Sequence, residues 1–205
     1  MGVRLTLQAG EAPTLIWYTN ISSLGLTNQT TAQCFWDGGT GTGDAVGYAL
    51  NFSQYDFGYD YGKPINRIKI YKEPEYYGAA VCLWKVKMPT AWEDIPTSSS
   101  SLQTSECTEI KVFNNSEISF VGGECVLTFP TIILADETEF ISLGMKNAKF
   151  GNNNNTKYPY YVYGKPSTLP NNPFIKFRAL NLSGPTGDLR TNFMPRYDIG
   201  YYGIQ

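Results

Sequence analysis

The sequence contains no histidine, few charged residues and no long apolar run. Without histidine the chain lacks the commonest general base and metal ligand of enzymes, and Ser–His and Cys–His nucleophile pairs are excluded. Charged residues are 17% of the chain and the net charge is −2, so we expect no binding of nucleic acid. No apolar run approaches the length of a membrane-spanning helix. We therefore expect a non-enzymatic protein with no cofactor, no metal and no membrane insertion.

What the chain does contain is typical of strands and turns. Aromatic residues are 15% of the chain, and there are 20 glycines and 12 prolines. Short extended segments, about eleven in all, recur at regular intervals between turn signals. This pattern predicts an all-β fold, an antiparallel β-sandwich or jelly roll with long surface loops, built as a single domain over residues 1–205. The longest expected loop covers residues 89–108, which include a run of four serines.

The strongest strand signal lies in residues 65–88, INRIKIYKEPEYYGAAVCLWKVKM. Ile68 and Ile70 alternate with basic residues, which places them on one face of a strand. Cys82 and Trp84 share a face in the second half, which we expect to be a core strand of the sandwich. A proline and a glycine between the halves indicate a turn.

Weaker signals complete the expected strand set and its connections. The glycine-rich segment 37–47 indicates a flexible turn, and residues 188–205 show no clear period. Further strands are expected at residues 15–18, 110–113, 118–121, 124–129, 131–134, 139–145, 158–163 and 175–179.

The N-terminal segment has its own pattern. Val3, Leu5, Leu7 and Ala9 alternate as in a strand, and no apolar core of a secretory signal is visible. We expect either that a leader has been removed or that the protein leaves its cell by lysis or inside an assembly. The segment 1–20 is a candidate strand for pairing with a neighbouring subunit.

Residues 55–61 alternate between aromatic and small or acidic side chains. In an extended conformation the aromatic rings would share one face and the carboxylates the other. One interpretation is an aromatic core face with a solvated acidic face. The other is a glycan platform, in which sugar rings stack on exposed aromatic rings and carboxylates bind hydroxyl groups. The candidate platform residues are Tyr55, Phe57, Tyr59, Tyr61, Asp56 and Asp60.

Four cysteines, Cys34, Cys82, Cys107 and Cys125, allow two interpretations. None lies in a CxxC motif, and without histidine a zinc site is not expected. In an oxidising compartment we favour the disulfides 107–125 and 34–82. In a reducing one, all four remain thiols.

Six Asn-X-Ser/Thr sequons mark candidate glycosylation sites. Sequons also arise by chance where asparagine, serine and threonine gather in surface turns. The candidate acceptors are Asn20, Asn28, Asn51, Asn114, Asn154 and Asn181.

Three segments carry a resemblance to a known fold: INRIKIYK, AAVCLWKV and TFPTIILADETEFISLGM. With them, residues 63–146 resemble the jelly-roll modules of carbohydrate-binding and galactose-binding-like families, which recur in viral tail and head appendages. In such modules the third segment is a strand, a short acidic turn and a strand that closes the sheet. The resemblance implies the fold and sugar binding on end loops or a concave sheet face, but no residue here matches a family site residue.

Three functions follow from these features. The first is a structural or adhesion protein of a virion surface, such as a fibre, decoration or tail component, that binds a host glycan and contacts itself or other structural proteins. The second is a glycosylated subunit of an extracellular filament or surface layer, in which residues 3–9 complete the sheet of a neighbour. The third is a glycosidase using two of Asp56, Asp60, Glu73 and Glu75, which requires a carboxylate pair about 5–10 Å apart.

Overall fold

The computed structural model describes residues 11–19, 27–28, 41–45, 48–50, 59–71, 80–87, 102–103, 106–150, 163–165, 174–177, 186–189, 194–195 and 197–204. Within these ranges the fold is built of strands, with one 3-10 turn, η3 (Asn115–Glu117). Every strand pairing is antiparallel. The all-β, antiparallel β-sandwich predicted from the sequence is confirmed.

One sheet has four strands and joins the two ends of the described chain. Each strand pairs with the next in the order β1, β15, β5, β9. Their bounds are β1 (Thr14–Trp17), β15 (Tyr197–Gly203), β5 (Pro64–Tyr71) and β9 (Glu124–Ile133).

The second sheet has eight strands. Its order is β7 (Leu102–Gln103), β13 (Thr186–Leu189), β12 (Phe174–Phe177), β4 (Tyr48–Leu50), β10 (Glu139–Phe150), β6 (Ala80–Lys87) and β8 (Glu106–Phe113). The eighth strand, β3 (Gly41–Ala45), pairs with the far end of β10. A small third sheet holds β14 (Met194–Pro195), β11 (Tyr163–Lys165) and β2 (Thr27–Asn28).

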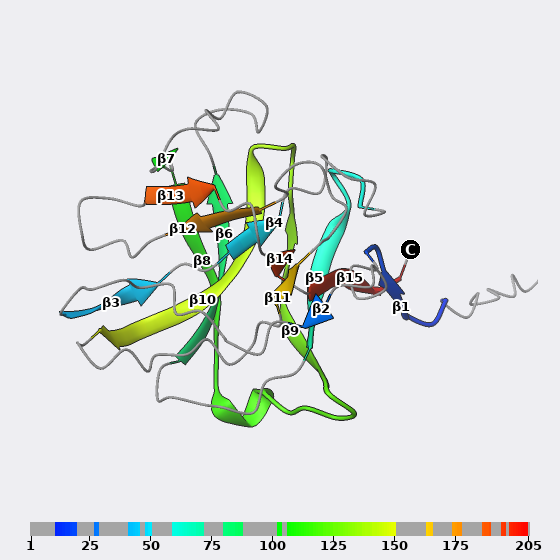
Figure 1. The fold of residues 1–205 in the computed structure, drawn as a ribbon. Helices are drawn as coiled ribbons and strands as arrows, with labels where there is room; N and C mark the ends of the chain where they lie inside the picture. Colours follow the sequence, from blue (N-terminus) through cyan, green and yellow to red (C-terminus); the bar gives the residue numbers. More distant parts are fainter. Residues whose placement is uncertain are drawn as a thin grey trace, which may run out of the picture.

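The core lies where the two large sheets meet (Figure 1). On β5 and β15 the alternate residues Ile68, Ile70, Tyr197 and Ile199 are buried. The Tyr197 hydroxyl donates a hydrogen bond of 3.0 Å to the carbonyl oxygen of Ile141 on β10, so it joins the two layers. On β6 the residues from Val81 to Trp84 are all buried, which confirms that this strand belongs to the core. A strand covered on both faces loses the apolar–polar alternation that a half-exposed strand keeps.

The two strands predicted in residues 65–88 are present, but they do not pair with each other. β5 belongs to the four-stranded sheet and β6 to the eight-stranded sheet. The chain therefore crosses from one layer to the other between them. Period-two spacing predicts which residues share a face, and it carries no information on which strand lies alongside.

Other expected boundaries also change. Residues 118–121, expected as a strand, form a loop with a single bridge from Val121 to Glu124. The two strands expected on either side of Pro130 are one strand, β9, because Pro130 is exposed on a sheet edge where its missing N–H removes no ladder bond.

Three segments expected to be irregular contain strands. The glycine-rich segment 37–47 contains β3, and residues 188–205, in which no period was recognised, contain β15. The expected loop 89–108 contains β7 and the start of β8. The rest of that loop and the N-terminal residues 1–10 lie outside the described residues.

Candidate functional site

The predicted glycan platform falls partly on described residues, and there it is not an exposed strand. Residues 59–63 form a turn that leads into β5. Tyr59 is only 6% exposed, and its ring packs against Tyr18 and, edge-on, against Tyr61, with centroid separations of 5.7 and 5.6 Å. Tyr59 is therefore a core residue and offers no ring face to a sugar. Asp60 is exposed and pairs with Lys63.

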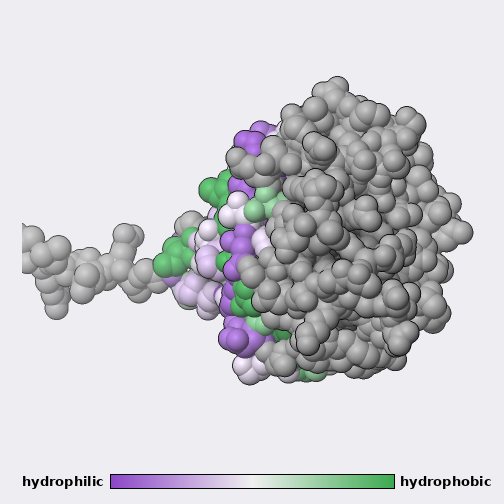
Figure 2. Space-filling model, turned by 90° about the vertical axis from the view of Figure 1, so that its left-hand side faces the viewer, coloured by the Kyte–Doolittle hydropathy of each residue, from purple (hydrophilic) through white to green (hydrophobic). Residues whose placement is uncertain are grey.

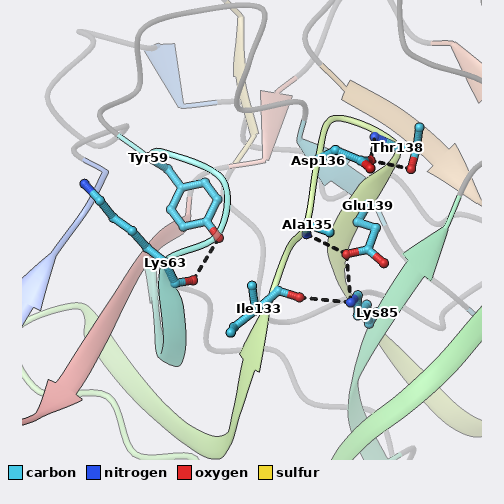
Figure 3. A network of polar contacts seen from close by, with 8 residues as sticks. All are labelled: Tyr59, Lys63, Lys85, Ile133, Ala135, Asp136, Thr138 and Glu139. Atoms are coloured by element: carbon cyan, nitrogen blue, oxygen red, sulfur yellow. Dashed lines mark hydrogen bonds and ion pairs between the residues drawn. The ribbon is translucent and has the colours of Figure 1, made fainter.

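The Tyr59 hydroxyl is held inside the protein. It donates a hydrogen bond of 3.0 Å to the carbonyl oxygen of Lys63, which closes the turn (Figure 3). Burial raises the pKa of Tyr59 to about 12, and burial also raises the pKa of the neighbouring Tyr18. Both phenols thus stay protonated at neutral pH and serve packing. The remaining platform residues Tyr55, Asp56 and Phe57 lie outside the described residues.

A charged pair within the eight-stranded sheet lies beside this turn and is hydrogen-bonded to β9 of the other sheet (Figure 3). Lys85 on β6 forms an ion pair of 2.8 Å with Glu139 on β10 and donates a bond of 2.9 Å to the carbonyl oxygen of Ile133 on β9. Glu139 is buried, and its Oε2 also accepts the main-chain N–H of Ala135 at 2.7 Å. The carboxylate thus has two donors, which offset the cost of its desolvation. The Lys85 amine and the Glu139 carboxylate are thus both held by structural partners.

A second lysine makes a similar link from β8. Lys111 donates 2.9 Å to the carbonyl oxygen of Thr128 on β9 and pairs with Glu117. The hydrogen bond from Lys111 and one from the main-chain N–H of Asn114 lower the pKa of Glu117. Two amines of the eight-stranded sheet therefore bind carbonyl oxygens of the same strand in the four-stranded sheet.

The outer surface of the four-stranded sheet carries aromatic and cationic side chains in contact. Lys69 lies 5.0 Å from the ring centre of Trp17, and Arg67 lies 5.2 Å from that of Tyr202. Both are cation–π distances. These four residues form what we call the cation–aromatic face. It is the surface in the described part of the chain that best fits a binding role, because aromatic and Arg side chains recur at recognition sites.

Main-chain contacts hold one half of this face in place. The side chain of Asn66 is nearly buried and pairs with the backbone of Tyr202: its Nδ2 donates 3.0 Å to the carbonyl oxygen, and its Oδ1 accepts the N–H at 2.8 Å. Arg67 in turn donates to the Asn66 carbonyl and side-chain oxygens at 2.8 and 3.1 Å. Asn66 thus extends the β5–β15 ladder beyond Gly200, where the main-chain register ends.

The other half is fixed by a buried carboxylate. Asp198 on β15 is 1% exposed, and its Oδ1 accepts a bond of 3.3 Å from the hydroxyl of Thr19. That hydroxyl oxygen accepts the N–H of Ile199 at 2.9 Å. Thr19 thus anchors the end of β1 to β15 and holds Trp17 against the sheet.

The sequence showed only part of this face. The alternation of Arg67 and Lys69 with isoleucines predicts that both cations lie on one side of β5. Their aromatic partners, Trp17 and Tyr202, come from opposite ends of the chain, and no local pattern links them.

The cysteines do not form the favoured pairing at 107–125. Cys125 is a buried free thiol on β9, whereas Cys107 lies on β8 in the other sheet. The segment between them is not a hairpin, since its two strands belong to different layers. Burial raises the pKa of the Cys125 thiol. Cys82 is buried with its Sγ 3.7 Å from the carbonyl oxygen of Leu83, and its predicted partner Cys34 lies outside the described residues.

One predicted glycosylation acceptor can be placed with its side chain. Asn114 is exposed at the end of β8, where its Nδ2 donates 3.2 Å to Glu117. Asn28 lies in β2, and its side chain is outside the described set. Asn20, Asn51, Asn154 and Asn181 lie outside the described residues.

The described side chains include no cluster of three or more Cys, Asp or Glu residues that could hold a metal ion. In the same residues, no helix has the length and hydropathy needed to cross a membrane. Figure 2 shows hydrophobic and hydrophilic residues close together where described residues reach that surface. Comparisons with protein-family models, curated proteins and solved structures find no match to this chain. The resemblance to jelly-roll sugar-binding modules therefore stays a prediction.

Proposed function

We propose that this chain is a non-enzymatic structural or adhesion protein of a virion surface, a fibre, decoration or tail component, that binds glycans through exposed aromatic side chains. The sandwich fold supports a scaffold role, and the resemblance to modules of viral appendages suggests the setting. The observation that carries the proposal is the cation–aromatic face. A sugar ring stacks on an aromatic ring, and a guanidinium binds hydroxyl or carboxylate oxygens beside it.

Tyr202 is the residue that best tests this proposal. It is 43% exposed, and Asn66 binds only its backbone, so Tyr202→Ala removes the ring and keeps the hydrogen bonds that shape the strand. Glycan-array binding should be present in the wild-type protein and at least about tenfold weaker in this variant, as for loss of one stacked ring.

The control is Val121→Ala, which trims an exposed side chain outside the strands of this sheet. It should bind as the wild type does. Absence of binding to any glycan, or equal loss in both variants, would contradict a site on this face.

A second candidate is a glycosylated subunit of an extracellular filament assembled by strand pairing between neighbours. The exposed side chain of Asn114, the first residue of an Asn-Asn-Ser sequon, favours it. Mass spectrometry of native material distinguishes the two candidates. Sugars on Asn114 and other sequons favour the filament subunit, and unmodified asparagines favour the virion protein.

A further inference from the structure

The two edges of the four-stranded sheet differ in how they are protected. At the β9 edge, Pro130 has no N–H to offer to another strand, and Lys85 and Lys111 donate to the carbonyl oxygens of Ile133 and Thr128. Lysine and proline at an edge hinder the addition of another strand, because they block or remove the groups that would pair. The β9 edge is therefore closed.

Within β1 itself none of these features is present, and Pro13 lies just before the strand begins. Its sequence, Thr-Leu-Ile-Trp, contains no charge and no proline. Residues 11–15 are all exposed, with Leu15 at 46%, and β15 is the one described strand that pairs with β1. Figure 1 shows β1 at the outer margin of the fold. An uncharged, apolar and exposed edge is a template for strand pairing.

The backbone polarity of β1 follows from one hydrogen bond. The N–H of Tyr18 donates 2.9 Å to the carbonyl oxygen of Ile199, in the register that pairs Ile16 with Tyr201. Along an antiparallel strand, the N–H and C=O groups of successive residues point alternately toward and away from the neighbouring strand. Those of Ile16, two positions before Tyr18, therefore also face β15. The N–H and C=O groups of Leu15 and Trp17 therefore point away from the sheet, toward the open edge.

We propose that two copies of this chain pair through their β1 strands, antiparallel, about a two-fold axis at Ile16. Leu15 of each copy then lies opposite Trp17 of the other, and the two pairs exchange four main-chain hydrogen bonds. An axis at Leu15 would place Trp17 opposite Pro13, which has no N–H to donate. The pairing joins two four-stranded sheets into one continuous sheet.

The same register matches the side chains. Residues opposite each other in an antiparallel pair share a face, so Leu15 contacts Trp17 of the second copy on the outer side. Ile16 lies opposite Ile16 of the second copy, on the inner side of the sheet. No charge is brought against a like charge, and a self-complementary contact of this kind closes into a dimer.

The inference rests on the structural role proposed above. Its tests measure only the association of two copies of the chain. A failure here leaves the glycan test unaffected, and a failure of glycan binding leaves this contact unaffected. The first test is sedimentation equilibrium of the full chain. The wild type should dimerise, and Leu15→Asp should raise the dimer Kd by about tenfold or more, since it alters two cross-strand pairs.

The matched control is Val126→Asp, at a position of similar exposure on β9, which should leave the Kd unchanged. A wild type that stays monomeric, or a control that dissociates as Leu15→Asp does, would overturn the proposal. So would dissociation by Leu5→Pro with none by Leu15→Asp, which would assign the contact to the segment 3–9.

The second test fixes the register without depending on stability. Ile16→Cys places two thiols opposite each other at a Cα separation of about 4.5 Å, within reach of a disulfide. In this register Thr14 lies opposite Tyr18 of the second copy, four positions along the strand from residue 14 of that copy. Thr14→Cys should therefore not cross-link. Oxidation should therefore give a covalent dimer with Ile16→Cys above the wild-type level, and an equal yield from Thr14→Cys would contradict the axis at Ile16.

Discussion

Lys85, which pairs with Glu139 and also bonds to β9 of the other sheet, offers a quantitative test of how the two sheets are held together. Replacing Lys85 by methionine keeps most of the length of the side chain and removes its charge. Glu139 then keeps one protein donor in the described contacts, the N–H of Ala135, although its side chain is only 10% exposed. Leaving a largely buried carboxylate without its cation is costly.

The magnitude follows from the burial of both partners. Loss of one member of a fully buried pair costs about 3–5 kcal/mol. Because the Lys85 side chain is 28% exposed and water can reach its place, we expect about 2 kcal/mol for Lys85→Met. Glu139→Gln keeps an oxygen to accept from Ala135 and should cost about 1 kcal/mol. The double variant should cost less than the sum of the two by about 1 kcal/mol or more.

Urea unfolding followed by tryptophan fluorescence measures these differences. With a slope of about 2 kcal/mol per molar, the midpoint of Lys85→Met should fall by about 1 M. A loss below about 0.5 kcal/mol for Lys85→Met would refute the inference that Lys85 joins the sheets. Additive effects in the double variant would refute its coupling to Glu139.

Three further outcomes are expected. Gly200→Ala should destabilise the protein, because a methyl group there would overlap the carbonyl oxygen of Ile16, and proteolysis should then release β1. Spectrophotometric titration should show a tyrosine with a pKa of about 12 that is absent in Tyr59→Phe; since folding raises this pKa, stability should fall as the pH rises from about 10 to 12. A hydrogen bond from the hydroxyl of Thr138 lowers the pKa of Asp136 below its usual 3.8. The stability that Thr138→Val loses at neutral pH should therefore shrink as the pH falls through that range, as chemical unfolding across a pH series would show.

The positions of strands along the chain could be predicted from this sequence better than which strands pair with one another. The alternation of Ile68 and Ile70 with basic residues located β5, and the apolar run around Trp84 located β6. Neither pattern indicated that these strands lie in different sheets, because pairing depends on contacts between distant segments.

The most consequential omission was β15, which lies between β1 and β5. Tyr197, Ile199 and Tyr201 do alternate, and this signal could have located the strand. It was obscured by Asp198 and Gly200, which lie between them and are buried where β15 contacts residues 16–19. A buried carboxylate is an unusual strand residue, and its partner Thr19 is 179 positions away.

The candidate site was harder to predict than the fold. Aromatic alternation in residues 55–61 indicated either a core face or a platform, and the burial of Tyr59 favours the core interpretation at that residue. The aromatic residues that the structure assembles on this face, half-buried Trp17 and exposed Tyr202, lack any common motif. They are brought together by β15, through contacts that only the folded chain makes.

The central place of β15 has a consequence for how the protein is made. Residues 14–17 leave the ribosome before the segment that flanks them in the native sheet, residues 200–203, which is translated some 185 positions later. At typical elongation rates of about 5–20 residues per second, β1 waits about 10–40 s as an apolar strand without its native neighbour. Chaperone binding in that interval would protect nascent chains from premature contact with one another.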